Sequence, residues 1–257
     1  MSSPLGKSLA VPLGRKTVTD FLYASMGIPI VTIEKEINIA ELVEARRIAN
    51  PRPSWCAIFT KAYAKVVASR PDLRRAYLTF PWERLFEYAE TTADVVLETT
   101  LGTETILTHA RLKRPAEMPL LDLDCEVTGC KADPLKHQKR LRRARLLARF
   151  PRLIRRWAWW YLLNVSARER AKQLGTFGVS SVANWGTEAL RPLAPWISLL
   201  HYGRIDADGK VALRLTFDHR VLDGSGSSAA LNEMERILKL DLLGELKSLQ
   251  NPMLKAG

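Results

Sequence analysis

The sequence predicts one domain of mixed α/β (α+β) class. Strand-like and helix-like segments alternate along its 257 residues, and neither an internal repeat nor a Pro- or Gly-rich linker divides them. Hydrophobic residues make up 47% of the chain, which is enough for one large core. We therefore expect residues 15–257 to fold as a unit. Residues 1–14 are expected to be a flexible leader, with too short an apolar stretch for a secretory signal.

The first half of the chain is predicted to begin with a helix over 15–25 and a strand over 30–37, where β-branched residues are frequent. Asn38 and Ser54 are the residue types that cap helices, so we expect helices to begin after each of them. The predicted elements that follow are helices at 39–48 and 54–69, strands at 75–80, 93–99 and 104–111, and a helix within 117–124.

The last third returns to strands. Residues 176–182 form one, and a hairpin is expected from 196–205 and 211–218 around the turn residues 206–209. Apolar residues alternate along the second hairpin strand, so Arg214, Thr216 and Asp218 should point to the opposite face of the sheet. A helix is expected over 229–240.

The basic charge of the chain is concentrated in one segment. The net charge is +12, from 39 Lys and Arg against 27 Asp and Glu. Thirteen of the basic residues and one acid, Glu169, lie in 136–172, and the remainder of the chain has equal numbers of each sign. Uniform affinity for polyanions is therefore not expected, and nucleic acid is an unfavoured partner because no recognition motif accompanies the charge.

This basic segment is predicted to be a helical insert of two helices divided at Phe150-Pro151. In the second helix Leu153, Ile154, Trp157, Trp160 and Tyr161 share a face, opposite Arg152, Arg155 and Arg156. Three interpretations stay open. The apolar face packs on its own domain or on a neighbouring subunit, or it rests on an anionic membrane surface. Alternatively, residues 136–149 bind phosphates of a ligand or an acidic carrier protein.

The three cysteines, Cys56, Cys125 and Cys130, are scattered and indicate free thiols in a reducing compartment. We expect no metal site and no membrane-spanning helix, because the most apolar run, 157–163, is far below the ~20 residues that a span needs. His109, His137 and His201 belong to no motif and are expected to be surface or packing residues. The expected location is the cytoplasm, with peripheral attachment to the inner membrane face as an alternative.

One motif indicates chemistry. The predicted strand ends at Phe217-Asp218, and His219, Asp223 and Gly224 follow within six residues. Histidine titrates near neutral pH and can take a proton from a thiol, hydroxyl or amine. Asp223 could lock the loop and Gly224 could permit a tight backbone path. A His-x-x-x-Asp spacing by itself more often closes a β-to-α turn than forms a catalytic base. The choice between these two interpretations therefore depends on the longer pattern of residues 218–224.

Asp218-His219-Arg220-Val221-Leu222-Asp223-Gly224 resembles the catalytic domain of the acyltransferase components of 2-oxoacid dehydrogenase complexes, which are similar to chloramphenicol acetyltransferase. Arg15-Lys16 and Ile28-Pro29 occur in the family's order. The stretch 175–181, Gly-Thr-Phe-Gly-Val-Ser-Ser, resembles the family's Gly-Thr-Phe-Thr-Ile-Ser-Asn. The resemblance covers about residues 14–245, and it implies a mixed-sheet sandwich with helices on one face.

The resemblance implies roles for individual residues. His219 would be the general base, and Ser180 would hydrogen-bond the oxyanion of the tetrahedral intermediate. Asp223 would be a structural carboxylate paired with Arg15, while Asp218 and Gly224 would support the loop. In the family the histidine and the serine come from neighbouring chains, so the resemblance implies a homotrimer with its active sites at the subunit interfaces.

The chain also departs from the family. No lipoyl domain is recognised, and residues 102–109 differ from the family's substrate-channel stretch. We therefore expect a stand-alone acyltransferase that uses an acyl-CoA or acyl carrier protein thioester, with no covalently bound cofactor and no lipoyl group. The acceptor is left open among thiol, hydroxyl and amine. The alternative is a catalytically idle trimeric scaffold, or a basic module that binds nucleic acid or membrane.

Overall fold

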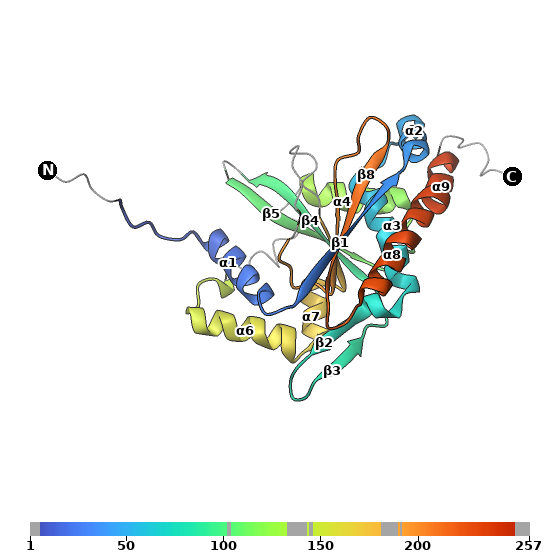
Figure 1. Cartoon of the computed structure of the whole chain (residues 1–257). Coiled ribbons are helices and arrows are strands. Elements are labelled where there is room, and N and C mark those ends of the chain that lie inside the picture. The colour runs from blue at the N-terminus through green and yellow to red at the C-terminus, as the bar shows by residue number, and fades with distance from the viewer. Residues whose placement is uncertain are drawn as a thin grey trace.

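A twisted mixed sheet forms the centre of the protein, as the computed structural model shows (Figure 1). The structure describes residues 6–101, 104–132, 143, 146–180, 190 and 192–249. Within them, six strands pair in the order β1-β8-β7-β6-β4-β5. Their bounds are β1 Ile30–Asn38, β4 Thr92–Leu101, β5 Glu104–Lys113, β6 Phe177–Ser180, β7 Ser198–Tyr202 and β8 Lys210–Asp218. β6 runs parallel to β4 and β7, and the other neighbours are antiparallel. The mixed α/β class is confirmed.

Helices cover one face of this sheet along its length. They are α2 Ala40–Ile48, α3 Trp55–Ser69, α4 Leu120–Ala132, α8 Gly224–Ile237 and α9 Leu243–Ser248, the last two joined by a π-helical turn, Leu238–Leu242. α3 is the most deeply buried of them, because small and apolar residues surround its axis. Ser54 caps it as predicted, its hydroxyl accepting from the amide of Ala57 at 3.2 Å. Tyr63 ties it to the sheet through the Ser198 hydroxyl, 2.7 Å away.

Three helices lie beyond one end of the other face: α1 Leu13–Ser25, α6 Arg152–Asn164 and α7 Ala167–Leu174. A second apolar cluster joins them to the sheet, with Leu163 and Trp196 at its centre and Phe21 and Trp159 packed against it. Leu199 of β7 belongs to this cluster, whereas the next residue, Leu200, belongs to the main core. The alternation along β7 shows that the two clusters lie on opposite faces.

Several predicted boundaries moved. α8 begins at Gly224 instead of residue 229, and Ile39 rather than Asn38 is the cap residue of α2, although the Asn38 side chain accepts from the amide of Ala40. A short hairpin, β2 Arg75–Leu78 and β3 Arg84–Glu87, contains a strand that the sequence pattern missed. The predicted first helix of the basic segment falls mostly at 133–142 and 144–145, outside the described residues.

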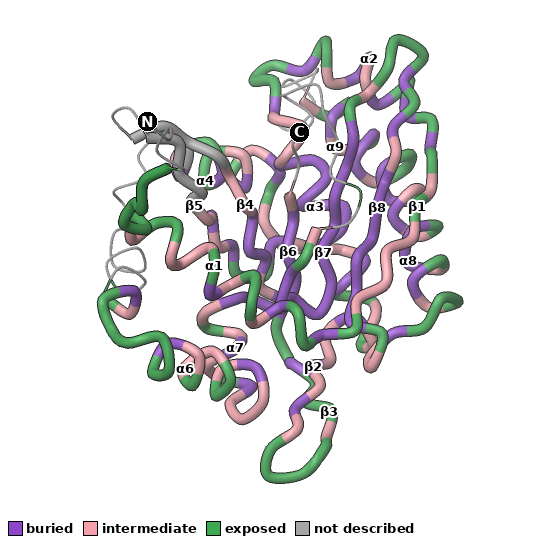
Figure 2. Tube along the Cα trace, turned by 60° about the vertical axis from the view of Figure 1, so that its left-hand side comes forward, coloured by how far each residue is buried: buried purple, intermediate pink, exposed green. Residues whose placement is uncertain are grey.

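α6 turns its apolar face to solvent. Leu153 is 80% exposed and Trp157 62%, and Ile154, Trp160 and Tyr161 are exposed with them. Figure 2 shows α6 at the margin of the chain, with exposed positions along it. The interpretation in which this stripe packs on its own domain is therefore wrong. The opposite face docks instead, because Arg155 pairs with Asp20 of α1 at 3.2 Å and Arg156 stacks on Tyr23.

Candidate active site

The motif residues lie where β8 ends, and the buried carboxylate of Asp218 organises the turn. It accepts two hydrogen bonds from the Arg220 guanidinium, at 2.9 and 2.7 Å, and one from the Arg220 amide at 3.1 Å. Bidentate pairs of this kind fix geometry as well as charge. The Arg220 guanidinium also stacks on Tyr77. Asp218 therefore fixes the side chain of Arg220 at the end of β8, and its supporting role in an active site stays a prediction.

His219 is held by its backbone and by one ring nitrogen. Its amide donates to the Pro29 carbonyl at 2.9 Å, and Nδ1 lies 3.0 Å from the Leu222 carbonyl oxygen. Because a carbonyl can only accept, Nδ1 carries the proton in neutral His219, and Nε2 has the free lone pair. The side chain is 47% exposed, so substrate can reach it. A fixed tautomer with an accessible Nε2 is the arrangement a general base requires.

Asp223 lies beside His219, and its carboxylate is 3.8 Å from Nδ1. The Asp223 side chain is 86% exposed, and the residue precedes the first turn of α8. Gly224 begins that helix with ample space around its Cα, and its φ is not in the left-handed region. Within the described chain, neither sterics nor backbone conformation therefore requires glycine at position 224, contrary to expectation.

Arg15 does not reach Asp223 within one chain. It is exposed on the first turn of α1. Among the described residues no ion pair joins the two, and the ionic neighbour found for Asp223 is His219. The predicted Arg15–Asp223 pair is thus not formed in the single subunit.

Ser180 is the last residue of β6 and is partly buried. It is aligned with His201 on β7, and His201 with Arg214 in the middle of β8. His219 follows β8 five residues later. Strand spacing and rise per residue place the Cα atoms of Ser180 and His219 about 20 Å apart. One chain therefore does not bring the two predicted catalytic residues together.

A row of polar residues crosses the sheet at the level of Ser180. The registers align Ser180, His201, Arg214 and Glu34 on four adjacent strands. Directly opposed residues project to the same face, and Arg214 forms an ion pair with Glu34. His201 and Arg214 are both buried. Sequence alternation placed Arg214 on this face, but it left His201 unassigned as a packing residue and did not single out Glu34.

His109 and Asp94 form a further polar pair, with Nδ1 3.1 Å from a carboxylate oxygen of the fully buried Asp94. Arg111 lies 3.9 Å from the same carboxylate. This explains His109 as a packing histidine with a charged partner. His137 lies outside the described residues.

In the described part of the chain, His, Cys, Asp and Glu side chains nowhere gather in a group of three that could hold a metal ion. A search of the same residues finds no helix with the length and apolarity needed to cross a membrane. Disulfide bonds join none of Cys56, Cys125 and Cys130.

No protein-family model matches the sequence, and no curated protein matches it. Solved structures do. A probable dihydrolipoamide acetyltransferase from Listeria monocytogenes aligns over 91% of this chain and 95% of its own, with a TM-score of 0.67 at 18% identity. Dihydrolipoamide acetyltransferase from Azotobacter vinelandii aligns over 94% and 95%, with a TM-score of 0.67 at 20% identity. That structure concerns the role of one serine, one histidine and one asparagine in its catalytic mechanism.

A chloramphenicol acetyltransferase aligns over 91% of this chain and 98% of its own, with a TM-score of 0.50 at 12% identity. At these identities the likeness establishes the fold. The chain has the chloramphenicol acetyltransferase-like fold, which it shares with the catalytic cores of dihydrolipoamide acetyltransferases.

Proposed function

We propose that the protein is an acyltransferase that moves an acyl group from a thioester, either acyl-CoA or an acyl carrier protein, to a thiol, hydroxyl or amine. The observation that carries this proposal is the state of His219, whose Nδ1 is fixed on a carbonyl while its ring stays half exposed. The acetyltransferase fold adds the second support. CoA would be a substrate, and the mechanism asks for neither a metal nor a lipoyl group.

In this mechanism Nε2 of His219 removes the proton from the acceptor as its nucleophilic atom attacks the thioester carbonyl. The carbonyl oxygen becomes an oxyanion, which the Ser180 hydroxyl stabilises by a hydrogen bond. The intermediate collapses, the carbon–sulfur bond breaks, and the leaving thiolate takes the proton back from His219. Asp223 flanks the imidazole, with its carboxylate 3.8 Å from Nδ1.

The distance between Ser180 and His219 within one chain supports a site shared between subunits. We infer a homotrimer in which His219 of one chain meets Ser180 of its neighbour. The Azotobacter protein offers a parallel, since the histidine and the asparagine named for it are four positions apart, as are His219 and Asp223. The acid at this position here departs from that asparagine.

Subunit mixing tests the mechanism and the interface together. H219A and S180A should each lose acyl transfer by about 10²-fold or more, while circular dichroism and sedimentation stay as in the wild type. Mixed trimers contain interfaces with an intact His219 and an intact Ser180, so random mixing should restore about a quarter of the wild-type rate. Full activity of H219A would refute the role of His219, and mixtures without recovery would refute the shared site.

The exposed apolar face of α6 is where a partner could bind. The ring contact between Phe80 and Trp160 extends it to the β2–β3 hairpin. A neighbouring subunit, an anionic membrane and a carrier protein remain the predicted partners of the 136–172 region. Co-sedimentation with anionic vesicles distinguishes the membrane from the other partners. If α6 binds membrane, the wild type should pellet with the vesicles, and W157A should stay in the supernatant.

A further inference from the structure

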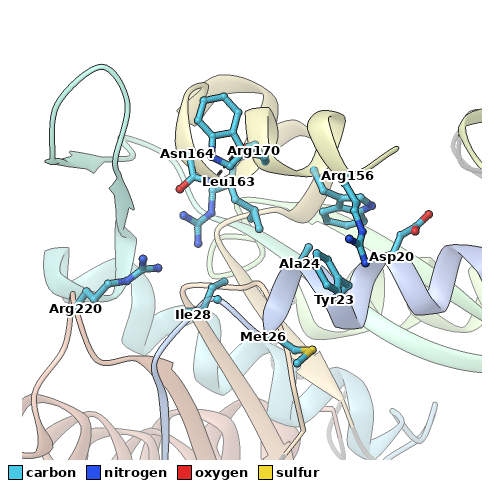
Figure 3. A pocket seen from close by; sticks show the side chains of 13 residues that line it. Asp20, Tyr23, Ala24, Met26, Ile28, Arg156, Leu163, Asn164, Arg170 and Arg220 are labelled. Carbon is cyan, nitrogen blue, oxygen red and sulfur yellow. Dashed lines mark hydrogen bonds between the residues drawn. The ribbon is translucent and has the colours of Figure 1, made fainter. Parts of the chain in front are cut away.

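A cavity of about 410 Å³ opens between α1 and α6 (Figure 3). It is bounded by residues of α1 and the turn after it, by α6, by Arg170 of α7, and by Arg220 of the motif loop. Its volume lies within the range of small-molecule sites. It adjoins the loop of His219, because the amide of His219 is bonded to Pro29 and the preceding residue, Ile28, lines the cavity.

Three guanidinium groups border this cavity: Arg156, Arg170 and Arg220. In Figure 3 Arg170 and Arg220 extend toward the same space from different elements, while Arg156 lies over Tyr23. Arg170 is only 2% exposed. Its two hydrogen bonds go to neutral carbonyl oxygens, of Tyr77 and Pro195, at 3.2 Å each.

Carboxylates accompany two of these three groups. Asp218 is held by Arg220. Asp20, the one acid among the lining residues that the structure describes, pairs with Arg155 and also attracts Arg156. Burial lowers the pKa of Arg170, against the opposing effects of Tyr88 and Asp218. A guanidinium taken out of water is stabilised by an anion that accepts its hydrogen bonds.

The rest of the wall is apolar. Ile28 and Leu163 are buried members of the second apolar cluster, and Trp159 packs against them. Met26 is exposed at the border of the cavity. A ligand here would therefore find hydrocarbon on one side and guanidinium groups on the other.

We propose that this cavity binds an amphiphilic organic anion, with its carboxylate or phosphate head between Arg170 and Arg220 and its hydrocarbon part on Trp159, Leu163 and Ile28. Both heads accept the paired hydrogen bonds that guanidinium groups donate. The site is independent of acyl transfer, although its occupant would contact Arg220, next to His219. It lies beside α6, and Trp160 of the exposed apolar face of that helix also lines it.

Calorimetric titration with three probes of equal chain length tests the site: decanoate, decyl phosphate and decanol. Decanoate or decyl phosphate should bind at least about tenfold more tightly than decanol, as a charge-assisted hydrogen bond contributes. The tighter of the two identifies the head group. Equal binding of decanol, or tighter binding of inorganic phosphate than of either amphiphile, would overturn the proposal.

Arg220 is the group to replace, because its guanidinium extends toward the same space as that of Arg170. R220Q should weaken binding of the preferred anion about tenfold, whereas R220K should recover part of it, and circular dichroism checks that both variants fold. R156Q removes the guanidinium at the other end of the cavity and should leave binding unchanged. If R220Q binds as the wild type does, or if R156Q weakens binding equally, the anion site is refuted. H219A should bind normally, so an error about catalysis does not affect this test.

Discussion

Gly178 stands in β6 where the resembling family sequence has threonine, and the packing around it gives a direct test. A Cβ at this position would lie 2.8 Å from Cδ1 of Leu199 and 2.8 Å from Cδ2 of Trp196. Both neighbours are buried in the second apolar cluster, so neither can move aside cheaply. Overpacking of this kind lowers the unfolding free energy by about 1–3 kcal/mol. Replacing glycine by alanine offsets about 0.4–1 kcal/mol of this loss, because the unfolded chain has less conformational entropy.

G178A should therefore lose about 1–2 kcal/mol of unfolding free energy, and G178T should lose more. Gly129, in α4, provides the matched control, because a Cβ there meets nothing within 4 Å. G129A should stabilise the protein by up to about 1 kcal/mol, as alanine does in helices. Urea unfolding followed by circular dichroism measures both changes. If G178A equals or exceeds the wild type in stability, the steric account of Gly178 fails.

Two further predictions concern buried polar groups. R155M should lower the unfolding free energy by about 2 kcal/mol. This is less than the ~3–5 kcal/mol lost when a typical buried pair is broken, because Arg156 and Arg152 also act on Asp20. Replacement of the exposed Arg152 in R152M is the control in urea unfolding, and equal losses in both variants would contradict an anchoring role for Arg155. Burial raises the pKa of Tyr88 to about 12. The folded state thus keeps a proton that the unfolded chain releases near pH 10, and stability should fall as pH rises from 10 to 12, by roughly 1.4 kcal/mol per pKa unit. In urea melts between pH 10 and 12, the unfolding free energy of Y88F should fall less steeply with pH than that of the wild type. An equal pH dependence in both proteins would exclude Tyr88 as its source.

Local periodicity predicted much of the fold. Alternation along β8 correctly separated Arg214, Thr216 and Asp218 from the core-facing residues, because a strand has only two faces. It could not show that these three residues are buried as well. The row of Arg214 with His201, Ser180 and Glu34 depends on the strand order, which brings together segments up to 180 residues apart.

The orientation of α6 shows a different limit. The helical period correctly gathered Trp157, Trp160 and their neighbours on one face. Which face turns inward was decided by Asp20 and Tyr23, more than a hundred residues earlier, which engage Arg155 and Arg156. The inward side also carries Trp159 and Leu163, which pack in the second apolar cluster beside the Arg155 ion pair and the Arg156 cation–π contact. The helix thus has two partly apolar sides, and the sequence pattern alone selected the one that faces solvent. The short β3 was missed because Arg84 and Glu87 interrupt its apolar pattern.

The strand arrangement that separates Ser180 from His219 has a consequence for how the protein would behave in dilute solution. In the proposed shared site, a chain alone holds only half of what turnover needs, so the rate per chain would depend on how many chains are assembled. Mass action would then link activity to concentration. If the proposed trimer is correct, serial dilution should lower the specific activity as it dissociates, whereas a site contained in one chain would keep it constant.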